Sequence, residues 1–261
     1  MRCSIYDALK KYSRRHAARF HMPGHKANRR HFPFFKDAAL DITELSFSDC
    51  LENPDGIIAS AERDIAEILG AEKSFILTDG SSCGIYAMLY AVKRRGGKVV
   101  ISRNSHKSVY NACAVLGIEP YILKGNELNG VLLPPAAAEI EDAFKKERDI
   151  CAALITSPDY YGNISDYQSI RKVCTRYGKL FLVDGAHGAY LRFDPDSAGA
   201  YAGEYADAWV DGAHKTLPAL TQGALLNVRE KSLVPDLKEG LDAFRTTSPS
   251  YPIMASVEYG V

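Results

Sequence analysis

From residue 57 onward, short apolar runs alternate with longer segments in which apolar residues recur every three or four positions. The apolar runs predict strands at 74–78, 98–102, 120–124, 151–156 and 179–183. The segments between them predict helices at 57–69, 82–95, 106–116, 135–147 and 166–177. Alternating strands and helices with short connections predict an α/β fold, in which helices cover both faces of a mostly parallel sheet.

Two further apolar runs follow, at 206–210 and 224–228. The connection between them is about a dozen residues long and contains Gly212 and Pro218. A helical crossover between parallel strands usually needs a longer connection. We therefore predict that one of these two strands runs antiparallel to its neighbours.

Residues 3–19 are predicted to form a basic amphipathic helix. One side carries Ile5, Leu9, Tyr12 and His16. The other side is rich in lysine and arginine, which is compatible with RNA binding or with a solvated helix face. Because the 32 basic residues of the chain are balanced by 32 acidic ones, we favour the solvated face and expect no nucleic-acid partner.

The segment 20–35 contains prolines and a glycine that interrupt any regular pattern, so we expect an irregular arm. Its histidines raise the question of a metal site. However, Pro23 and Gly24 separate His21 from His25, which argues against the helical i, i+4 geometry of a zinc-binding pair. We predict no metal site.

Composition narrows the class of protein further. The chain has 261 residues, of which 46% are hydrophobic, enough for a sizeable core. No run approaches the ~18–20 consecutive apolar residues of a membrane span, and the N-terminal segment lacks the apolar core of a signal peptide. Six cysteines occur without a C-x-x-C pair, which favours reduced thiols. We expect a cytoplasmic protein without a membrane partner.

Polar side chains follow nearly every predicted strand. The sequences DGSSCG, RNSHKS, SPDYYGN, DGAHGAY and DGAHKT each stand directly after a strand, and the strand at 120–124 is an exception. In open α/β sheets, ligands bind beyond the carboxyl ends of the strands. This convergence predicts a functional site at that edge of the sheet.

Gly80, Ser81 and Ser82 stand at the predicted start of a helix. Free backbone N–H groups and the helix dipole favour a phosphate there, and the serine hydroxyls add donors. A serine that simply caps the helix is the alternative. Neither G-x-G-x-x-G nor G-x-x-x-x-G-K-[ST] occurs in the chain, so the usual dinucleotide and nucleoside-triphosphate signatures are missing.

Three more residues are candidates for ligand contacts. Asp184 ends an apolar strand, and a carboxylate buried there needs a partner. The protonated ring nitrogen of a cofactor would serve, and so would a helix N-terminus or a salt bridge. His187 could orient this carboxylate or contact a ligand, and His106 could present its imidazole face to an aromatic ring.

Lys215 lies between two apolar runs, with Gly212 before it and Pro218 after it. A partly desolvated lysine has a lowered pKa, and its neutral amine can form a Schiff base with an aldehyde. Beside a phosphate site, an aspartate and a stackable ring, this lysine points to pyridoxal 5′-phosphate. The helix start would hold the phosphate, Asp184 the pyridine nitrogen and Lys215 the aldehyde.

Seven segments extend this pattern over nearly the whole chain: FHMPGHK (20–26), DGSS (79–82), NSHKSV (104–109), SPDYYG (157–162), VDGAHGAY (183–190), AHKTLPALTQG (213–223) and TSPSY (247–251). Together they resemble the Orn/Lys/Arg decarboxylase family of fold-type-I pyridoxal-phosphate enzymes. FHMPGHK and HKTLPALTQ are highly specific, whereas DGSS by itself is not. The resemblance implies an aminotransferase-like major domain with a mostly parallel, seven-stranded sheet.

The resemblance also implies catalytic roles. Lys215 would be the Schiff-base lysine and Asp184 the partner of the pyridinium nitrogen. His106 would stack on the cofactor ring, and His187 would lie beside the cofactor and assist the reaction. The FHMPGHK arm and the TSPSY segment are expected near the subunit boundary of a homodimer.

The remaining cofactor contacts implied by the resemblance concern the phosphate. Gly80, Ser81 and Ser82 would hold it, with His214 close by. Members of the family often carry a hydroxyl residue three positions before the Schiff-base lysine, where this chain has Gly212. One phosphate donor is therefore expected to be missing or replaced.

The implied activity is decarboxylation of a basic amino acid, which is arginine, lysine or ornithine, to agmatine or a diamine. Another fold-type-I activity, such as that of an aminotransferase or aldolase, is an alternative, and so is a cofactor-binding subunit without turnover. We expect an N-terminal helix and arm over 1–55 and a cofactor-binding domain over 56–235. Residues 236–261 would begin a linker to a C-terminal domain that is absent from this chain.

Overall fold

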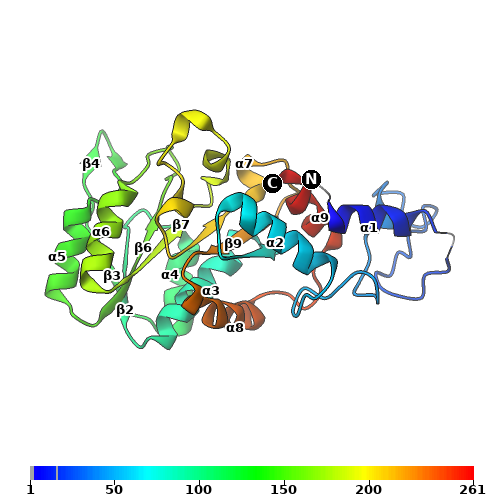
Figure 1. Cartoon of the computed structure of the whole chain (residues 1–261), viewed down its shortest axis with the longest axis horizontal. Coiled ribbons are helices and arrows are strands. Elements are labelled where there is room, and N and C mark those ends of the chain that lie inside the picture. The colour runs from blue at the N-terminus through cyan, green and yellow to red at the C-terminus, as the bar shows by residue number, and fades with distance from the viewer. Residues whose placement is uncertain (1–2, 16) are drawn as a thin grey trace.

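The computed structural model describes residues 3–15 and 17–261, and these contain a seven-stranded sheet in the order β1-β9-β8-β7-β6-β2-β3 (Figure 1). Its strands are β1 (Lys73–Leu77), β2 (Lys98–Ile101), β3 (Pro120–Ile122), β6 (Ile150–Thr156), β7 (Leu180–Asp184), β8 (Ala208–Asp211) and β9 (Ala224–Val228). Strand β9 pairs antiparallel with β1 and with β8. The other neighbouring strands pair in parallel, so the predicted mostly parallel sheet with an antiparallel strand is confirmed.

The five helices that alternate with the strands, beginning with α2 before β1, lie where the apolar periodicity predicts them, with ends shifted by up to two residues. They are α2 (Ile57–Leu69), α3 (Gly80–Arg94), α4 (Lys107–Leu116), α5 (Ala137–Lys146) and α6 (Tyr167–Tyr177). Gly70, Gly117 and Gly178 follow three of them with left-handed φ angles of 69°, 61° and 63°. A residue in this conformation ends a helix, and glycine adopts it without a Cβ clash.

Side chains alternate along the strands between two apolar cores. In β6, Ala153 and Ile155 belong to the core beneath α2, α5 and α6. Ala152 and Leu154 face the opposite core, beneath α3, α4 and a further helix, α8 (Val234–Phe244). In the view of Figure 1, α3 and α8 lie together below the sheet. Burial on both faces explains why these strands read as continuous apolar runs in the sequence.

The N-terminal helix is shorter than predicted. Helix α1 spans Ser4–Ser13, with Ile5, Leu9 and Tyr12 buried as expected. The chain then turns back, so that the Arg19 guanidinium lies 4.9 Å from the centre of the Tyr12 ring. The expected helix over 3–19 is therefore wrong at its C-terminal end, and His16 lies outside the described residues.

The start of α1 is held by the last helix, α9 (Tyr251–Gly260). The carboxylate of Glu258 accepts hydrogen bonds from the backbone N–H groups of Ile5 (2.9 Å) and Tyr6 (3.1 Å). These N–H groups belong to the first turn, where a helix offers them no acceptor of its own. Sequence periodicity pointed to neither α8 nor α9, and both pack on the cores of the sheet.

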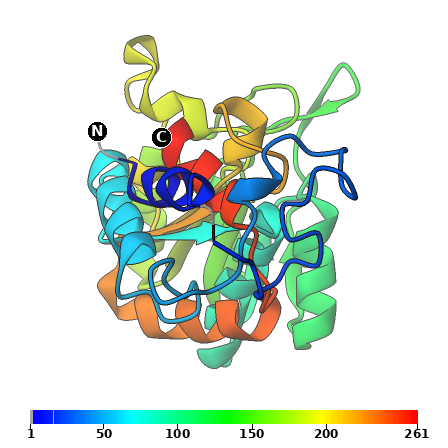
Figure 2. The same cartoon turned by 90° about the vertical axis from the view of Figure 1, so that its right-hand side faces the viewer.

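The arm that follows α1 consists of turns and bends, as expected, up to a 3-10 helix at Ala38–Leu40. It faces the viewer in Figure 2. His25 Nε2 lies 3.1 Å from the Asp41 carboxylate, and its ring stacks on Phe32. Across the residues that the structure describes, no group of three or more His, Cys, Asp or Glu side chains is arranged to hold a metal ion.

Two smaller features complete the fold. Strands β4 (Glu127–Leu128) and β5 (Val131–Leu132) form a two-stranded hairpin, and α7 (Ala213–Thr216) is a single turn. Both elements are too short for periodicity to detect. Among the helices of residues 3–15 and 17–261, none has the length and apolar character needed to cross a membrane.

Candidate active site

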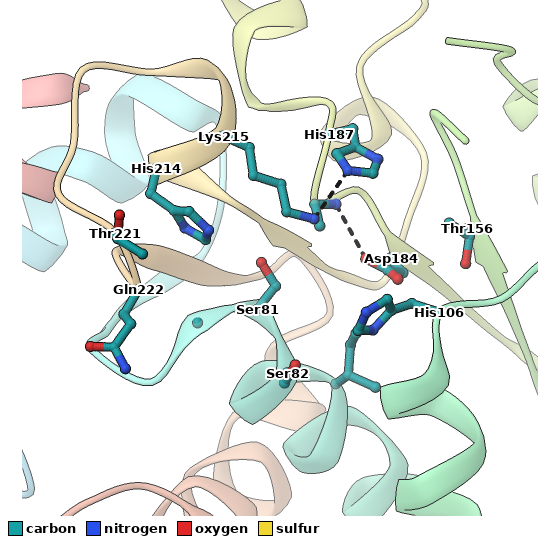
Figure 3. Close-up of a pocket in the computed structure, with 13 residues that line it drawn as sticks. Ser81, Ser82, His106, Thr156, Asp184, His187, His214, Lys215, Thr221 and Gln222 are labelled. Carbon is teal, nitrogen blue, oxygen red and sulfur yellow. Dashed lines mark hydrogen bonds between the residues drawn. The ribbon is translucent and has the colours of Figure 1, made fainter. Parts of the chain in front are cut away.

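A cavity of about 260 Å³ opens at the edge where the parallel strands end. It is lined by the start of α3 (Gly80, Ser81 and Ser82) and by His106, Asp184, His187, His214 and Lys215, which are the predicted site residues (Figure 3). Its volume is close to the lower end of the ~300–1,000 Å³ typical of small-molecule sites. The cavity therefore lies beyond the carboxyl ends of the strands, where the sequence predicted a functional site.

The start of α3 is open toward a ligand. Its N-cap residue, Asp79, makes no side-chain capping bond, and Ser81 and Ser82 lie inside the first turn instead of capping it. The Ser81 hydroxyl is buried, and no hydrogen-bond partner for it exists within the described part of the chain. An uncapped helix start with an unpaired buried hydroxyl is suited to an anion.

Asp184 is the last residue of β7 and is 2% exposed. Its Oδ1 accepts a hydrogen bond from the backbone N–H of Ala186 at 3.2 Å. Burial raises the pKa of this carboxyl group, while the Ala186 N–H and the positive charge of Lys215 act in the opposite direction. A cationic partner in the cavity would stabilise the ionised form.

Lys215 and His187 meet across the cavity, with Lys215 Nζ 3.1 Å from His187 Nε2. Partial burial lowers the pKa of Lys215, and the charge of Asp184 opposes this effect. Burial, followed by the charge of Lys215, also lowers the pKa of His187. When Lys215 is an ammonium it can only donate, so that Nε2 of His187 accepts and the ring proton of His187 lies on Nδ1.

Two other histidines are oriented by local hydrogen bonds. His106 caps α4, with its Nδ1 accepting from the Ser108 backbone N–H at 3.3 Å and lying 2.8 Å from the Ser108 hydroxyl. His214 Nδ1 lies 2.8 Å from the carbonyl oxygen of Gly223. A carbonyl only accepts, so Nδ1 of His214 carries a proton and Nε2 is left for a ligand.

Sequence reasoning missed Thr156, Thr221 and Gln222, which also line the cavity. The predicted site residues stand at or after the carboxyl ends of parallel strands. Because β9 is antiparallel, its start lies at this same edge of the sheet, so Thr221 and Gln222, which precede β9, also reach the cavity. The backbone N–H of Gly80 donates to the carbonyl oxygen of Gln222 at 2.9 Å, which ties this connection to the start of α3. Thr156 is the last residue of β6, paired in register with Asp184.

Gly212 has a steric role. A Cβ at this position would lie 2.5 Å from the carbonyl oxygen of Ala186 and 3.2 Å from the hydroxyl of Ser81. The turn that carries Lys215 therefore packs directly on the residues that follow Asp184. A hydroxyl side chain cannot be placed at 212 without moving the backbone.

The residues around the cavity fit pyridoxal 5′-phosphate. In the described part of the chain, the buried hydroxyls of Ser81 and Thr156 have no partner, and the carboxylate of Asp184 accepts a 3.2 Å hydrogen bond from the Ala186 N–H. Lys215 supplies an amine whose pKa is lowered. A molecule with an anionic group, a ring nitrogen and an aldehyde would use all three features.

Solved structures define the class to which this fold belongs. Lysine decarboxylase A from Pseudomonas aeruginosa superposes with a TM-score of 0.88 and 21% identity, over 98% of this chain and 39% of its own. The constitutive lysine decarboxylase of Escherichia coli superposes with a TM-score of 0.82 and 25% identity. The match covers 99% of this chain and 40% of that one. The chain has the fold of the fold-type-I enzymes, as predicted.

The family follows from sequence comparison. The family described as Orn/Lys/Arg decarboxylase, major domain, matches residues 3–261. An arginine decarboxylase of Bacillus subtilis (strain 168) is 32% identical over 267 residues, which is 97% of this chain and 54% of that protein. An uncharacterized protein of the same organism, YaaO, is 33% identical over 99% of this chain and 56% of its own length. The chain belongs to the Orn/Lys/Arg decarboxylase family and spans about half the length of these relatives.

Proposed function

We propose that this chain is the cofactor-binding part of a pyridoxal-phosphate-dependent enzyme that decarboxylates a basic amino acid, which is arginine, lysine or ornithine. The observation that carries the proposal is the convergence of the Lys215 amine, the Asp184 carboxylate and the start of α3 on one cavity. Relatives named arginine decarboxylase and lysine decarboxylase support the substrate class.

When bound, the cofactor would supply an electron sink for the bond between the substrate Cα and its carboxylate. Lys215 would provide the amine that binds the aldehyde, because burial favours its neutral, nucleophilic form. His187 Nε2, 3.1 Å from Nζ, is placed to take a proton from the ammonium form of Lys215 and so release the neutral amine. Asp184 would hold positive charge at the ring nitrogen, where burial limits competition from water for its carboxylate.

The other residues of the cavity would bind and orient. Ser81 and Ser82, in the first turn of α3, would donate to the phosphate, and His214 would lie close to it. His106 would present its ring face to the cofactor, since its Nδ1 is engaged with Ser108.

At the scale of the whole protein, we propose a cytoplasmic homodimer. All six cysteines are free, which is compatible with a reducing compartment. Burial raises the pKa of the Cys83 thiol to about 12 and that of Cys113 to about 11, so these two are poorly reactive.

The division of the chain into an N-terminal helix and arm (1–55), a cofactor-binding domain (56–235) and the start of a linker (236–261) stays a prediction.

Replacement of Lys215 by alanine tests the site. We expect the purified chain to bind pyridoxal 5′-phosphate, and borohydride reduction to fix it on a peptide that contains Lys215. Lys215→Ala should abolish this fixation, whereas Lys124→Ala, which removes an exposed lysine outside the cavity, should not. Fixation that persists in Lys215→Ala, measured by peptide mass, would refute the assignment.

Product analysis tests the reaction. Arginine, lysine and ornithine are each added to the cofactor-loaded protein, and CO2 and the organic product are quantified. An amine together with CO2 supports the decarboxylase. A keto acid would favour an aminotransferase, and cofactor fixed on Lys215 without any turnover would favour a non-catalytic subunit.

A further inference from the structure

Asp211 is a buried acid that the proposed chemistry does not use. It ends β8, four residues before Lys215, and is 1% exposed. Its Oδ2 accepts hydrogen bonds from the Tyr201 hydroxyl (2.8 Å), the Trp209 indole N–H (2.9 Å) and the Asn227 amide (2.8 Å). We call these four side chains the Asp211 cluster.

The two oxygens of Asp211 are in very different surroundings. Three donors converge on Oδ2, whereas Oδ1 is buried and lacks a partner among the described residues. The donors of the cluster are neutral groups, so none compensates a negative charge. A proton on Oδ1 would remove the charge and leave all three hydrogen bonds to Oδ2 intact.

Two tyrosines are close to Asp211, and neither can supply a compensating positive charge. Tyr201 donates to it from the segment before β8. Tyr167, on α6, lies close enough to feel the charges of both Asp211 and Asp184. Burial raises the pKa of Asp211 to about 7, against the opposing effect of its three hydrogen bonds.

The Asp211 cluster links the turn of Lys215 to the antiparallel side of the sheet. Asn227 belongs to β9, and its Oδ1 accepts a hydrogen bond from the Ser74 hydroxyl of β1 at 2.7 Å. On the other side of the turn, the Gly212 backbone N–H lies 3.2 Å from the carbonyl oxygen of Ala186. The turn is thus held between the end of the strand of Asp184 and the strands of the Asp211 cluster.

We propose that Asp211 is a positioning residue for Lys215, and that as a neutral carboxylic acid it anchors the turn carrying the lysine to β9 and β1 and so holds the amine opposite Asp184. What the amine does rests on the proposed function. The anchoring itself does not, and it can be measured in the cofactor-free protein.

Asn at position 211 separates the neutral form from the ionised one. Its amide oxygen accepts the same three hydrogen bonds, and its NH2 group replaces the protonated oxygen without charge. Asp211→Asn is therefore a mimic of the proposed neutral acid, whereas Asp211→Ala leaves three buried donors without an acceptor.

The first experiment measures thermal unfolding of the cofactor-free wild type and Asp211→Asn between pH 5 and pH 8. The pKa of Asp211 is raised from 3.8 to about 7 in the folded state. Stability linked to this proton is therefore present at low pH and is lost as the pH rises toward 7. Asp211→Asn has no such loss, so its Tm relative to wild type should increase from pH 5 to pH 8. A Tm deficit that stays constant over this range would overturn the neutral acid.

The second experiment measures Lys215 itself, by the pH dependence of its acylation in the cofactor-free protein and by cofactor affinity. Asp211→Ala should shift the acylation midpoint and weaken cofactor binding by about tenfold or more, since misplacement by about 1 Å can cost 10²-fold at a reacting group. Asp211→Asn should retain the wild-type midpoint.

Glu258→Gln is the matched control, because Glu258 is a buried acid that accepts backbone hydrogen bonds at the start of α1 and does not line the cavity. It should lower Tm without shifting the midpoint of Lys215. If Asp211→Ala also lowers Tm without shifting the midpoint of Lys215, Asp211 is merely structural and the inference fails.

If Asp211→Ala does not fold, Tyr201→Phe removes one donor of the cluster and decides by the same criterion. If wild type binds no cofactor, the proposed function fails, while acylation and unfolding still test Asp211.

Discussion

Burial changes the ionisation of the residues that face the cavity, and it acts on acids and bases in opposite senses. The carboxyl group of Asp184 has a raised pKa, whereas the pKa values of Lys215 and His187 are lowered. Each shift favours the neutral form, because desolvation penalises charge. The positive charge of Lys215 lowers the pKa of Asp184, and the negative charge of Asp184 raises the pKa of Lys215. Replacement of either residue should therefore shift the pKa of the other.

Asp184→Asn tests this coupling. The charge of Asp184 raises the pKa of Lys215, so its removal should lower that pKa further and make the amine more reactive toward acylation at neutral pH. Decarboxylation should nevertheless fall by roughly 10²–10³-fold, as for other preorganised charge-stabilising groups, because the amide cannot hold positive charge at the ring nitrogen. Acylation rates against pH and CO2 release measure the two effects.

Asp142→Asn, at an exposed carboxylate on α5, serves as the control and should change neither quantity. An unchanged acylation profile in Asp184→Asn would show that the two side chains are not electrically coupled.

At the scale of elements, the site depends on how three connections meet. The start of α3 is hydrogen-bonded to the connection before β9, and the turn at Gly212 is hydrogen-bonded to the segment after β7. The Gly212 turn is the tightest of these contacts, since a Cβ there would lie 2.5 Å from a backbone oxygen. Backbone atoms cannot rotate away as a flexible side chain can.

We therefore expect Gly212→Ser to lower both stability and cofactor affinity, although it restores the hydroxyl that the family resemblance leads one to expect. We expect it to destabilise the fold by about 1–3 kcal/mol, as overpacking usually does, and to weaken cofactor binding. Gly24→Ser is the control, because a Cβ at Gly24 meets nothing within 4 Å. Denaturant unfolding and cofactor titration measure the outcome, and tighter cofactor binding by Gly212→Ser would contradict the steric account.

At the scale of the whole molecule, the arm after α1 presents large apolar side chains to solvent. Phe20 is 93% exposed and Phe34 is 89% exposed, and the arm forms one end of the molecule (Figures 1 and 2). Exposed aromatic residues of this size are typical of interaction sites. This is compatible with the proposed homodimer, in which the arm would lie at the subunit boundary.

Light scattering tests the dimer directly. We expect the wild-type chain to be dimeric at micromolar concentration. Burying a Phe side chain contributes about 1.5–3 kcal/mol, so the double variant Phe20→Ser, Phe34→Ser should raise the dimer dissociation constant at least about tenfold. Val115→Ser, at another exposed apolar residue on α4, should not. A wild-type monomer at all concentrations would refute the homodimer.

Most of the fold could be predicted because its signals are local. Helix α2 has the bounds expected from periodicity and from Gly70, and β9 is antiparallel as its short connection suggested. The prediction was wrong for the end of α1, because the amphipathic pattern continues in the sequence beyond Ser13, the last helical residue. Beyond that point Arg19 folds back over Tyr12, a contact that periodicity does not encode.

The amino-acid sequence by itself determined the alternation of strands and helices and the identity of the polar residues at the strand ends. These features depend on residues a few positions apart, where backbone propensity and burial of one face suffice. Tertiary structure decided that Thr156, Thr221 and Gln222 join the cavity and that Asp211 is buried among three donors. The physical reason is that both outcomes depend on which strands become neighbours and in which direction they run, and only packing between segments distant in the chain determines that.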